Sequence, residues 1–214
     1  MVKSDGRSKA ALVEVCRELH QLDYCPWTSG NVSIRLDAKR VLITPTAVPK
    51  RSMTPADAVI VGLDGKHLSG KRKATSELGL HLQVYRLRSD VGAVVHAHPP
   101  TATAFACAGV ALDQPIASEF IVALGRAPLA PYAMPGTPEL AASLENLIPK
   151  HDAVLMGNHG VVAYAKDLDT AFGKMQLVEH FAKIVLGTMT IGKQAVLGPA
   201  DIRRLEDAGK TYGR

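Results

Sequence analysis

The amino-acid sequence predicts a single α/β/α domain over residues 1–214. Short apolar runs with strand character occur near both ends of the chain, and segments with apolar residues at helical spacing lie between them. This order favours one layered unit over two. A hydrophobic content of 47% is enough for one sizeable core. No internal repeat or low-complexity segment divides the chain.

Composition narrows the class of protein. No run of about 18 apolar residues is present, so we expect no membrane span. Charges interrupt the apolar positions of the N-terminal segment, so we expect no signal peptide. The three cysteines (Cys16, Cys25 and Cys107) form no CxxC pair and fit a reducing cytoplasm. The net charge of +5 mildly favours an anionic substrate, but no basic run interleaved with aromatic residues indicates a nucleic-acid surface.

The individual elements follow from periodicity and from glycine, proline and capping residues. Thr54 followed by Pro55 predicts a helix start, and Asp167 predicts the cap of a long helix. The proline-rich segment 128–138 is expected to be a connection. We predict helices at 6–22, after Ser76, at 101–107, 139–147 and 199–208, and after Asp167, and strands at 32–36, 41–43, 58–63, 91–98, 153–156 and 161–164.

The most informative stretch is VGAVVHAHP at 91–99, in which His96 and His98 end an apolar run before Pro99. Side chains at i and i+2 of a strand point to the same face, so both imidazoles should converge at the end of a rigid element. This spacing suits two ligands of one metal ion such as zinc, which takes three protein ligands in a catalytic site. The alternative is a pair of partly exposed histidines at a strand end.

Other polar residues have both a structural and a functional interpretation. His159 lies between glycines in a tight turn, where a turn residue is as ordinary as a ligand. Ser76 and Glu77 begin a helix, where a carboxylate suits the helix dipole and where anions also bind. Glu119 places a carboxylate in an apolar segment. Packed, surface or interface positions are expected for His81, Glu179 and His180.

Two loops rich in hydroxyl and amide groups, TSGN at 28–31 and ITPTA at 43–47, are expected at one end of neighbouring strands. Such loops can direct backbone N–H groups at a phosphate. Ordinary turns are the alternative when each loop is taken alone.

Five motifs occur in the order seen in one family: TSGN at 28–31, ITPT at 43–46, TSE at 75–77, VVHAH at 94–98 and GNHG at 157–160. The chain resembles the class II aldolase/adducin family, and most of all its L-fuculose-phosphate aldolase-like members. The similarity runs from the first helix to about residue 187.

The resemblance implies a three-layer domain around a mostly antiparallel sheet, and a C4 homotetramer with active sites at subunit interfaces. His96, His98 and His159 would bind zinc, or another divalent ion such as Mn²⁺ or Co²⁺. Glu77 would be the catalytic acid/base and a ligand of the resting metal. A glutamate suits that role best if burial raises its pKa toward neutrality. The substrate phosphate would be held by Gly30, Asn31, Thr46, Ala47, Thr75 and Ser76.

Two residues depart from the family pattern. Many members have glycine where this chain has Ala47; if that position needs a positive φ, alanine costs about 1 kcal/mol. Fuculose-phosphate aldolases carry a tyrosine near Glu119. The related methylthioribulose-phosphate dehydratases have a catalytic glutamate there but generally lack the one found here as Glu77. A subunit-interface salt bridge is the alternative role for Glu119.

The favoured hypothesis is a metal-dependent aldolase that cleaves a ketose 1-phosphate to dihydroxyacetone phosphate and an aldehyde. The alternatives on the same scaffold are a methylthioribulose-1-phosphate dehydratase-like lyase and a sugar-acid phosphate decarboxylase or epimerase. A non-catalytic module like the adducin head is disfavoured, because such a module is expected to have degraded metal ligands and here all three histidines and Glu77 are present.

Overall fold

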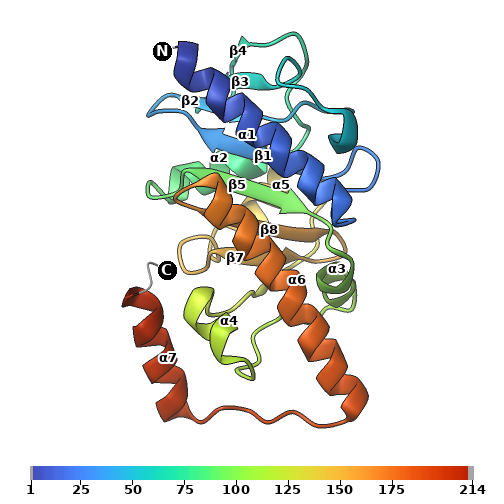
Figure 1. Cartoon of the computed structure of the whole chain (residues 1–214), viewed down its shortest axis with the longest axis vertical. Coiled ribbons are helices and arrows are strands. Elements are labelled where there is room, and N and C mark those ends of the chain that lie inside the picture. Colours follow the sequence, from blue (N-terminus) through green and yellow to red (C-terminus); the bar gives the residue numbers. More distant parts are fainter. Residues whose placement is uncertain (1, 212–214) are drawn as a thin grey trace.

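A computed structural model, which describes residues 2–211, is built around a twisted eight-stranded sheet (Figure 1). The strand order in this described part is β4-β3-β2-β1-β5-β8-β7-β6. Among these strands, all neighbours are antiparallel except β6 and β7, which confirms the mostly antiparallel sheet. The strands are β1 (Asn31–Arg35), β2 (Arg40–Ile43), β3 (Val59–Gly62), β4 (His67–Ser69), β5 (Ala93–Ala97), β6 (Leu129–Ala130), β7 (Ala153–Met156) and β8 (Gly160–Ala165).

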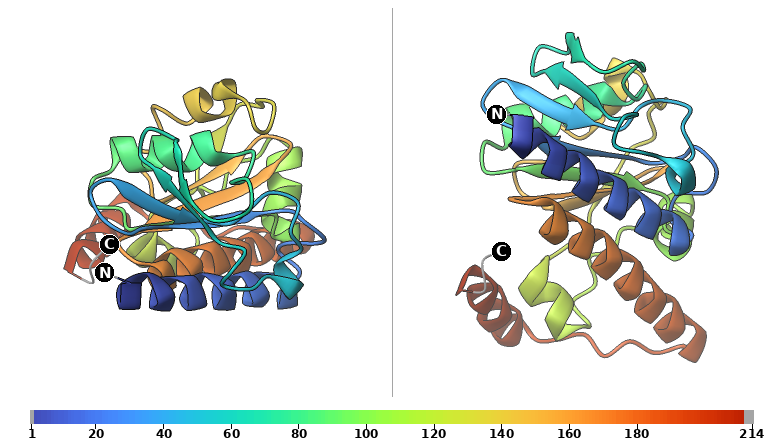
Figure 2. Two further views of the ribbon diagram at one scale, coloured as in Figure 1. Left: turned by 90° about the horizontal axis from the view of Figure 1, so that it is seen from above. Right: turned by 45° about the horizontal axis from the view of Figure 1, so that its top comes forward.

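Helices cover both faces of the sheet, which confirms the three-layer α/β/α class (Figure 2). Helices α1 (Val2–Gln21) and α6 (Leu168–Ile191) lie on one face, and α2 (Leu78–Leu87) and α5 (Pro138–Ser143) lie on the other. The remaining helices are α3 (Pro100–Cys107), α4 (Ser118–Ala123), α7 (Pro199–Thr211) and the short 3-10 helix η1 (Lys50–Ser52). Within residues 2–211, no helix is both long and apolar enough to cross a membrane.

Strand β5 lies between β1 and β8, and all five of its residues are buried. Its even positions face α2 and α5, and its odd positions face α1 and α6, because side chains alternate along a strand. Val94 therefore belongs to one apolar core and Val95 to the other. The end of β5 is held rigidly from both sides, and this is where His96 stands.

The predicted caps and turns have mixed outcomes. Asp167 caps α6, accepting the Thr170 N–H at 2.8 Å, as predicted. The prediction of a helix after Thr54 is wrong. The backbone N–H and the hydroxyl of Thr54 both donate to the Asp57 carboxylate, and they close a single turn before β3 begins.

Other boundaries also differ from expectation. The two-residue strand β6 lies within the proline-rich connection, where its pairing with β7 has no local signal. Helix α5 ends at Ser143, and turns replace the rest of the predicted helix. Helix α7 extends past the predicted end at residue 208 and includes Lys210 and Thr211, whereas Tyr212 lies outside the described residues.

Candidate active site and metal centre

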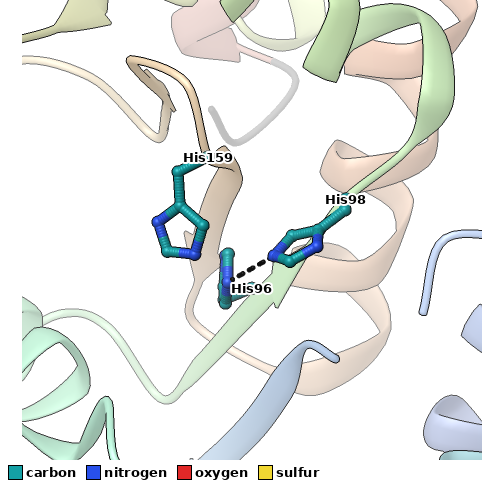
Figure 3. A group of neighbouring side chains, drawn as sticks. All are labelled: His96, His98 and His159. Atoms are coloured by element: carbon teal, nitrogen blue, oxygen red, sulfur yellow. Dashed lines mark hydrogen bonds between the residues drawn. The ribbon is translucent and has the colours of Figure 1, made fainter. Parts of the chain in front are cut away.

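Three imidazoles converge where β5 ends beside β8. His96 is the fourth residue of β5, His98 follows the strand, and His159 lies in the turn between β7 and β8. Antiparallel pairing of Ala97 with Val161 brings the turn to the end of β5. One ligand atom from each histidine lies within 4.8 Å of the other two, and the rings point toward one another (Figure 3). The sequence-predicted histidines therefore meet at one point.

Gly160 makes this approach possible. A Cβ atom at this position would lie 2.6 Å from His98 Cδ2 and 2.7 Å from the Ala97 carbonyl oxygen. Only glycine leaves room there. Asn158, one residue before His159, has a φ of 55°, so the turn is held in a left-handed conformation.

Glu77 completes the cluster. It occupies the N-cap position of α2 and is 8% exposed. Its Oε2 lies 3.2 Å from His96 Nε2, and its Oε1 lies 3.3 Å from His159 Nε2. Asn31 Nδ2 donates to Oε2 at 2.7 Å. Among the described residues, Oε1 has no hydrogen-bond partner although it is buried, so one oxygen remains available.

The protonation of the histidines suits ligation. His96 Nδ1 donates to the Val161 carbonyl at 2.9 Å, so in the neutral ring Nε2 carries the lone pair. His98 Nε2 lies 3.2 Å from His96 Nε2 (dashed in Figure 3). Burial lowers the pKa of His98 to about 3 and that of His159 to about 4, and the charge on His96 adds to both shifts. Both rings are therefore neutral at pH 7, the form that binds metals.

Three nitrogen donors and one carboxylate facing a single point fit a zinc-type divalent cation. The fit rests on two observations: the imidazole nitrogens of His96 and His98 face each other at 3.2 Å, and the buried Oε1 of Glu77 has no hydrogen bond within the described residues. At His96, burial lowers the pKa, but the Glu77 carboxylate outweighs burial and raises it.

The pKa of Glu77 does not follow the expectation from burial. Burial raises it, but the charge on His96 and the hydrogen bonds from His96 and Asn31 outweigh burial and hold the pKa well below its usual value. The condition that burial raises this pKa toward neutrality is therefore not met in this arrangement. The sequence alone does not show the donors that the fold brings to Glu77 from β1 and β5.

The candidate phosphate-binding segments lie beside this cluster. Thr46 N–H donates to the Lys73 carbonyl and Thr75 N–H to the Thr44 carbonyl, so the 43–47 and 73–77 segments run together. Thr46, Ala47 and Ser76 are exposed.

The other predicted phosphate contacts are less open. Thr75 is buried, and its hydroxyl accepts the Glu77 N–H at 3.3 Å. Asn31 pairs with His96 across the β1–β5 ladder, and its side-chain amide is engaged by Glu77. Gly30 has a φ of 69°, and its backbone lies against the carbonyl of His96.

A cleft of about 500 Å³ opens from Ser76 and Glu77 and runs between α2 and α5. Gln83 and Thr137 line it further out. Gly136, in the proline-rich connection, lies against Ser76. The cleft gives a small ligand access to the Glu77 carboxylate.

Backbone strain is concentrated around the site. Of the four non-glycine residues with positive φ in residues 2–211, Trp27 (51°), Ala47 (57°) and Asn158 (55°) flank site segments. Ala47 thus occupies the conformation that favours the glycine of many family members. Strained backbone that persists at a site is held there by its surroundings.

The hydrogen-bond partners of several buried polar residues were not anticipated. His81, for which a packed or surface position was expected, is fully buried and bonded to Asn31 and Ser33. Glu179, expected at a surface or interface, is 1% exposed and accepts N–H groups at the start of α3. His180 is exposed. A signal for His81 existed: it follows Glu77 by four residues, on the same face of a helix.

Glu119 is not part of the histidine cluster within the described chain. It is exposed in the first turn of α4 and forms no hydrogen bond or ion pair with the three histidines in residues 2–211. Helix α4 packs on α7, and Phe120 stacks on Phe181 of α6. A catalytic role for Glu119 stays a prediction.

The chain matches a known protein family over most of its length. The model of the Class II Aldolase and Adducin N-terminal domain matches residues 10–186. The chain therefore belongs to the class II aldolase and adducin family.

Its relatives include enzymes of two kinds. The chain is 37% identical to the 5-deoxy-D-ribulose 1-phosphate aldolase of Bacillus thuringiensis serovar kurstaki, over 87% of this chain and 88% of that protein. It is 30% identical to the 3-oxo-tetronate 4-phosphate decarboxylase of Haemophilus influenzae, over 97% of this chain and 100% of that protein. A solved L-fuculose 1-phosphate aldolase superposes with a TM-score of 0.87 at 31% identity, covering 94% of this chain and 95% of that one.

Proposed function

We propose that the protein is a metal-dependent class II aldolase that reversibly cleaves a ketose 1-phosphate to dihydroxyacetone phosphate and an aldehyde. The substrate is an L-fuculose 1-phosphate-like or 5-deoxypentulose 1-phosphate-like sugar. The observation that carries the proposal is that His96, His98 and His159 lie together beside the Glu77 carboxylate. One oxygen of that carboxylate accepts no hydrogen bond within the described residues. The aldolase relative at 37% identity supports the choice of substrate class.

The residues divide the chemistry between them. His96, His98 and His159 would hold a divalent cation, zinc or else Mn²⁺ or Co²⁺, and Glu77 would ligate it in the resting state. When bound, the cation supplies Lewis-acid stabilisation for the negative charge that develops on substrate oxygens. Glu77 is the acid/base that moves a proton at the carbon which gains negative charge when the C–C bond breaks.

Neutral donors would hold the phosphate away from the cation. The exposed residues Thr46, Ala47 and Ser76 would offer hydroxyl or backbone groups to the phosphate. The less exposed part of the same region would be lined by Gly30, Asn31 and Thr75. The cleft between α2 and α5, whose lining includes Ser76 and Glu77, would admit the sugar.

We also propose a homotetramer whose active sites lie at subunit interfaces. Three large apolar side chains are exposed on the loops that flank the site: Trp27 at 81%, Tyr132 at 62% and Met134 at 65%. Exposed large apolar side chains on the loops around a site are candidates for contact with another subunit. The exposed Glu119 would act in a neighbour's site or in an interface ion pair. The proposed location is the cytoplasm.

Two alternatives have specific support. A sugar-acid phosphate decarboxylase or epimerase is supported by the decarboxylase relative, which is similar over its whole length. A dehydratase of the methylthioribulose-1-phosphate type is supported by Glu119 within its Ser118-Glu119-Phe120 motif.

Metal analysis combined with product identification tests the proposal. Purified protein is incubated with the 1-phosphates of fuculose, ribulose and 5-deoxyribulose and with 3-oxo-tetronate 4-phosphate. We expect near-stoichiometric divalent metal and equimolar dihydroxyacetone phosphate and aldehyde from a ketose 1-phosphate. A diketo product indicates the dehydratase, and carbon dioxide indicates the decarboxylase. Full activity after exhaustive chelation contradicts the metal-dependent mechanism.

A further inference from the structure

A continuous line of buried hydrogen bonds joins β1 to α2 and ends on Glu77. Tyr85 Oη lies 2.8 Å from Ser33 Oγ, which lies 2.7 Å from His81 Nδ1. His81 Nε2 lies 2.5 Å from Asn31 Oδ1, and Asn31 Nδ2 lies 2.7 Å from Glu77 Oε2. All five residues are at most 8% exposed. The line lies on the face of the sheet that carries the apolar core around Val94 and Tyr164.

The line exists because strand and helix repeats match. Residues two apart on a strand share a face and are separated by about 7 Å. Residues four apart on a helix share a face and are separated by about 6 Å. Asn31 and Ser33 on β1 therefore stay in register with Glu77 at the N-cap of α2 and with His81 and Tyr85 within that helix.

The direction of every hydrogen bond follows from the one at Glu77. An ionised carboxylate only accepts, so the NH₂ end of the Asn31 amide must face it and the oxygen must face His81. His81 Nε2 then carries the hydrogen, and its bare Nδ1 accepts from the Ser33 hydroxyl. Ser33 in turn accepts from Tyr85. Burial lowers the pKa of His81 to about 3, so the ring is neutral, as this order requires.

We propose that Ser33, His81 and Tyr85 are positioning residues that hold the Asn31 amide with its NH₂ group on Glu77 and thereby fix the plane of that carboxylate toward the histidine cluster. The catalytic part of this inference rests on the proposed role of Glu77, whereas the orientation of Asn31 does not. If the line is broken at Ser33, His81 Nδ1 loses its donor and the preference for hydrogen on Nε2 falls. The Asn31 amide then has a second orientation that places its oxygen against the carboxylate.

Kinetics of matched hydroxyl deletions test the catalytic part. We expect Ser33→Ala to lower kcat by about 10-fold, the usual effect of removing an outer partner, and to change KM by less than about 2-fold. Tyr85→Phe, one step further from Glu77, should lower kcat by about 3-fold. Ser33→Thr keeps the hydroxyl and should restore most of kcat.

Tyr164→Phe is the control. Tyr164 is fully buried in the same core as Tyr85 and donates only to the Ile148 carbonyl, at 3.4 Å. Its loss should lower stability without changing kcat. If Ser33→Ala and Tyr85→Phe keep the kcat of Tyr164→Phe, the positioning role is wrong.

A second readout does not depend on activity. Nitrogen NMR of protein labelled in its histidines should show His81 with hydrogen on Nε2 in the wild type, and a mixture of tautomers in Ser33→Ala. Hydrogen on Nδ1 in the wild type overturns the inference whatever the kinetics show. If no ketose 1-phosphate is cleaved, the proposed function fails, and the tautomer measurement alone decides the positioning line.

Discussion

The two faces of the sheet each bury a glutamate, and the two sites differ in a simple way. Glu77 lies on the α2 face and Glu179 lies in α6 on the other face, at 8% and 1% exposure. Both oxygens of Glu179 are used: they accept the N–H groups of Thr101 and Ala102 at 3.2 and 2.8 Å. Glu77 has one oxygen bonded to Asn31 and, in the described chain, one without a hydrogen bond.

The difference teaches that burial alone does not mark a reactive carboxylate. Glu179 completes the first turn of α3, where a helix leaves its N–H groups unpaired and a negative charge is favoured. It thereby anchors the segment that follows His98. Glu77 also stands at a helix start, but it is turned toward His96 and His159 and keeps a lone pair free. A carboxylate whose two oxygens both accept hydrogen bonds stabilises the fold. A carboxylate with an oxygen that accepts none can still bind a ligand or react.

The largest expected effect comes from Glu77→Gln. We expect kcat to fall by about 10² to 10⁴-fold, because an amide cannot carry the proton, with little change in stability. The measurements are ketose 1-phosphate cleavage and exchange of the dihydroxyacetone phosphate proton into deuterated water. Glu139→Gln, at the exposed start of α5, is the control and should be neutral. Exchange at the wild-type rate in Glu77→Gln means that the role is assigned to the wrong residue.

Glu179→Ala should instead affect stability. Removing it leaves buried N–H groups without an acceptor, which should lower the free energy of unfolding by about 3 kcal/mol. Its kcat per folded molecule should stay within about 3-fold of wild type, because the residue does not touch the site. Lys183→Ala removes only the exposed partner of Glu179 and should cost at most about 0.5 kcal/mol in urea unfolding. Equal losses in the two variants would remove the contrast between the two carboxylates.

The pH dependence of stability should report His81. Its pKa is about 3 in the folded protein, because burial disfavours the charged ring, and about 6.5 when unfolded. Ser33 and Asn31 bond to the ring, and the charges of His96 and Glu77 act on it. The unfolded chain binds the extra proton, so this contribution is complete above about pH 6.5 and is lost as the pH falls.

Lowering the pH from 6.5 to 5 should therefore reduce the free energy of unfolding by roughly 2 kcal/mol because of His81. Urea unfolding at pH 5, 6 and 7 measures the slope. His81→Gln has no titrating ring, so its stability should depend less steeply on pH. Parallel slopes for the variant and the wild type would show that His81 is not buried in its neutral form.

The smallest expected effect is at Ala47. Its φ of 57° costs about 1 kcal/mol for alanine, and glycine relieves this at the expense of unfolded-state entropy. Ala47→Gly should therefore raise the free energy of unfolding by less than about 1 kcal/mol. Ala108 is exposed with a φ of −78°, so Ala108→Gly should lower stability instead. A loss of stability in both variants would mean that the left-handed conformation carries no strain.

Local patterns predicted much of the fold and of the histidine cluster. Alternation in the Asn31 segment identified β1, and the apolar run before His96 identified β5. The glycines around His159 marked the turn that carries it to the cluster. Each of these features is encoded within a few neighbouring residues, which is why the sequence alone predicts them.

The features that were missed depend on partners far along the chain. Nothing near Glu179 indicates that the start of α3 will lie against it. The sequence leaves His81 as a packed or surface residue, because its partners Ser33 and Asn31 lie far along the chain on β1. The low pKa of Glu77 likewise arises from groups on β1 and β5. The sequence contains all of these residues, but it does not show which of them come into contact in the fold.

The adjacency of β5 and β8 bears on when the cation can act. These strands are neighbours in the sheet although a long segment of chain separates them, so in the unfolded polypeptide His159 is far along the chain from His96 and His98. The third imidazole joins the other two only where β5 and β8 pair. A metal ion that needs all three would therefore bind the folded chain more tightly than the unfolded one, and would stabilise it.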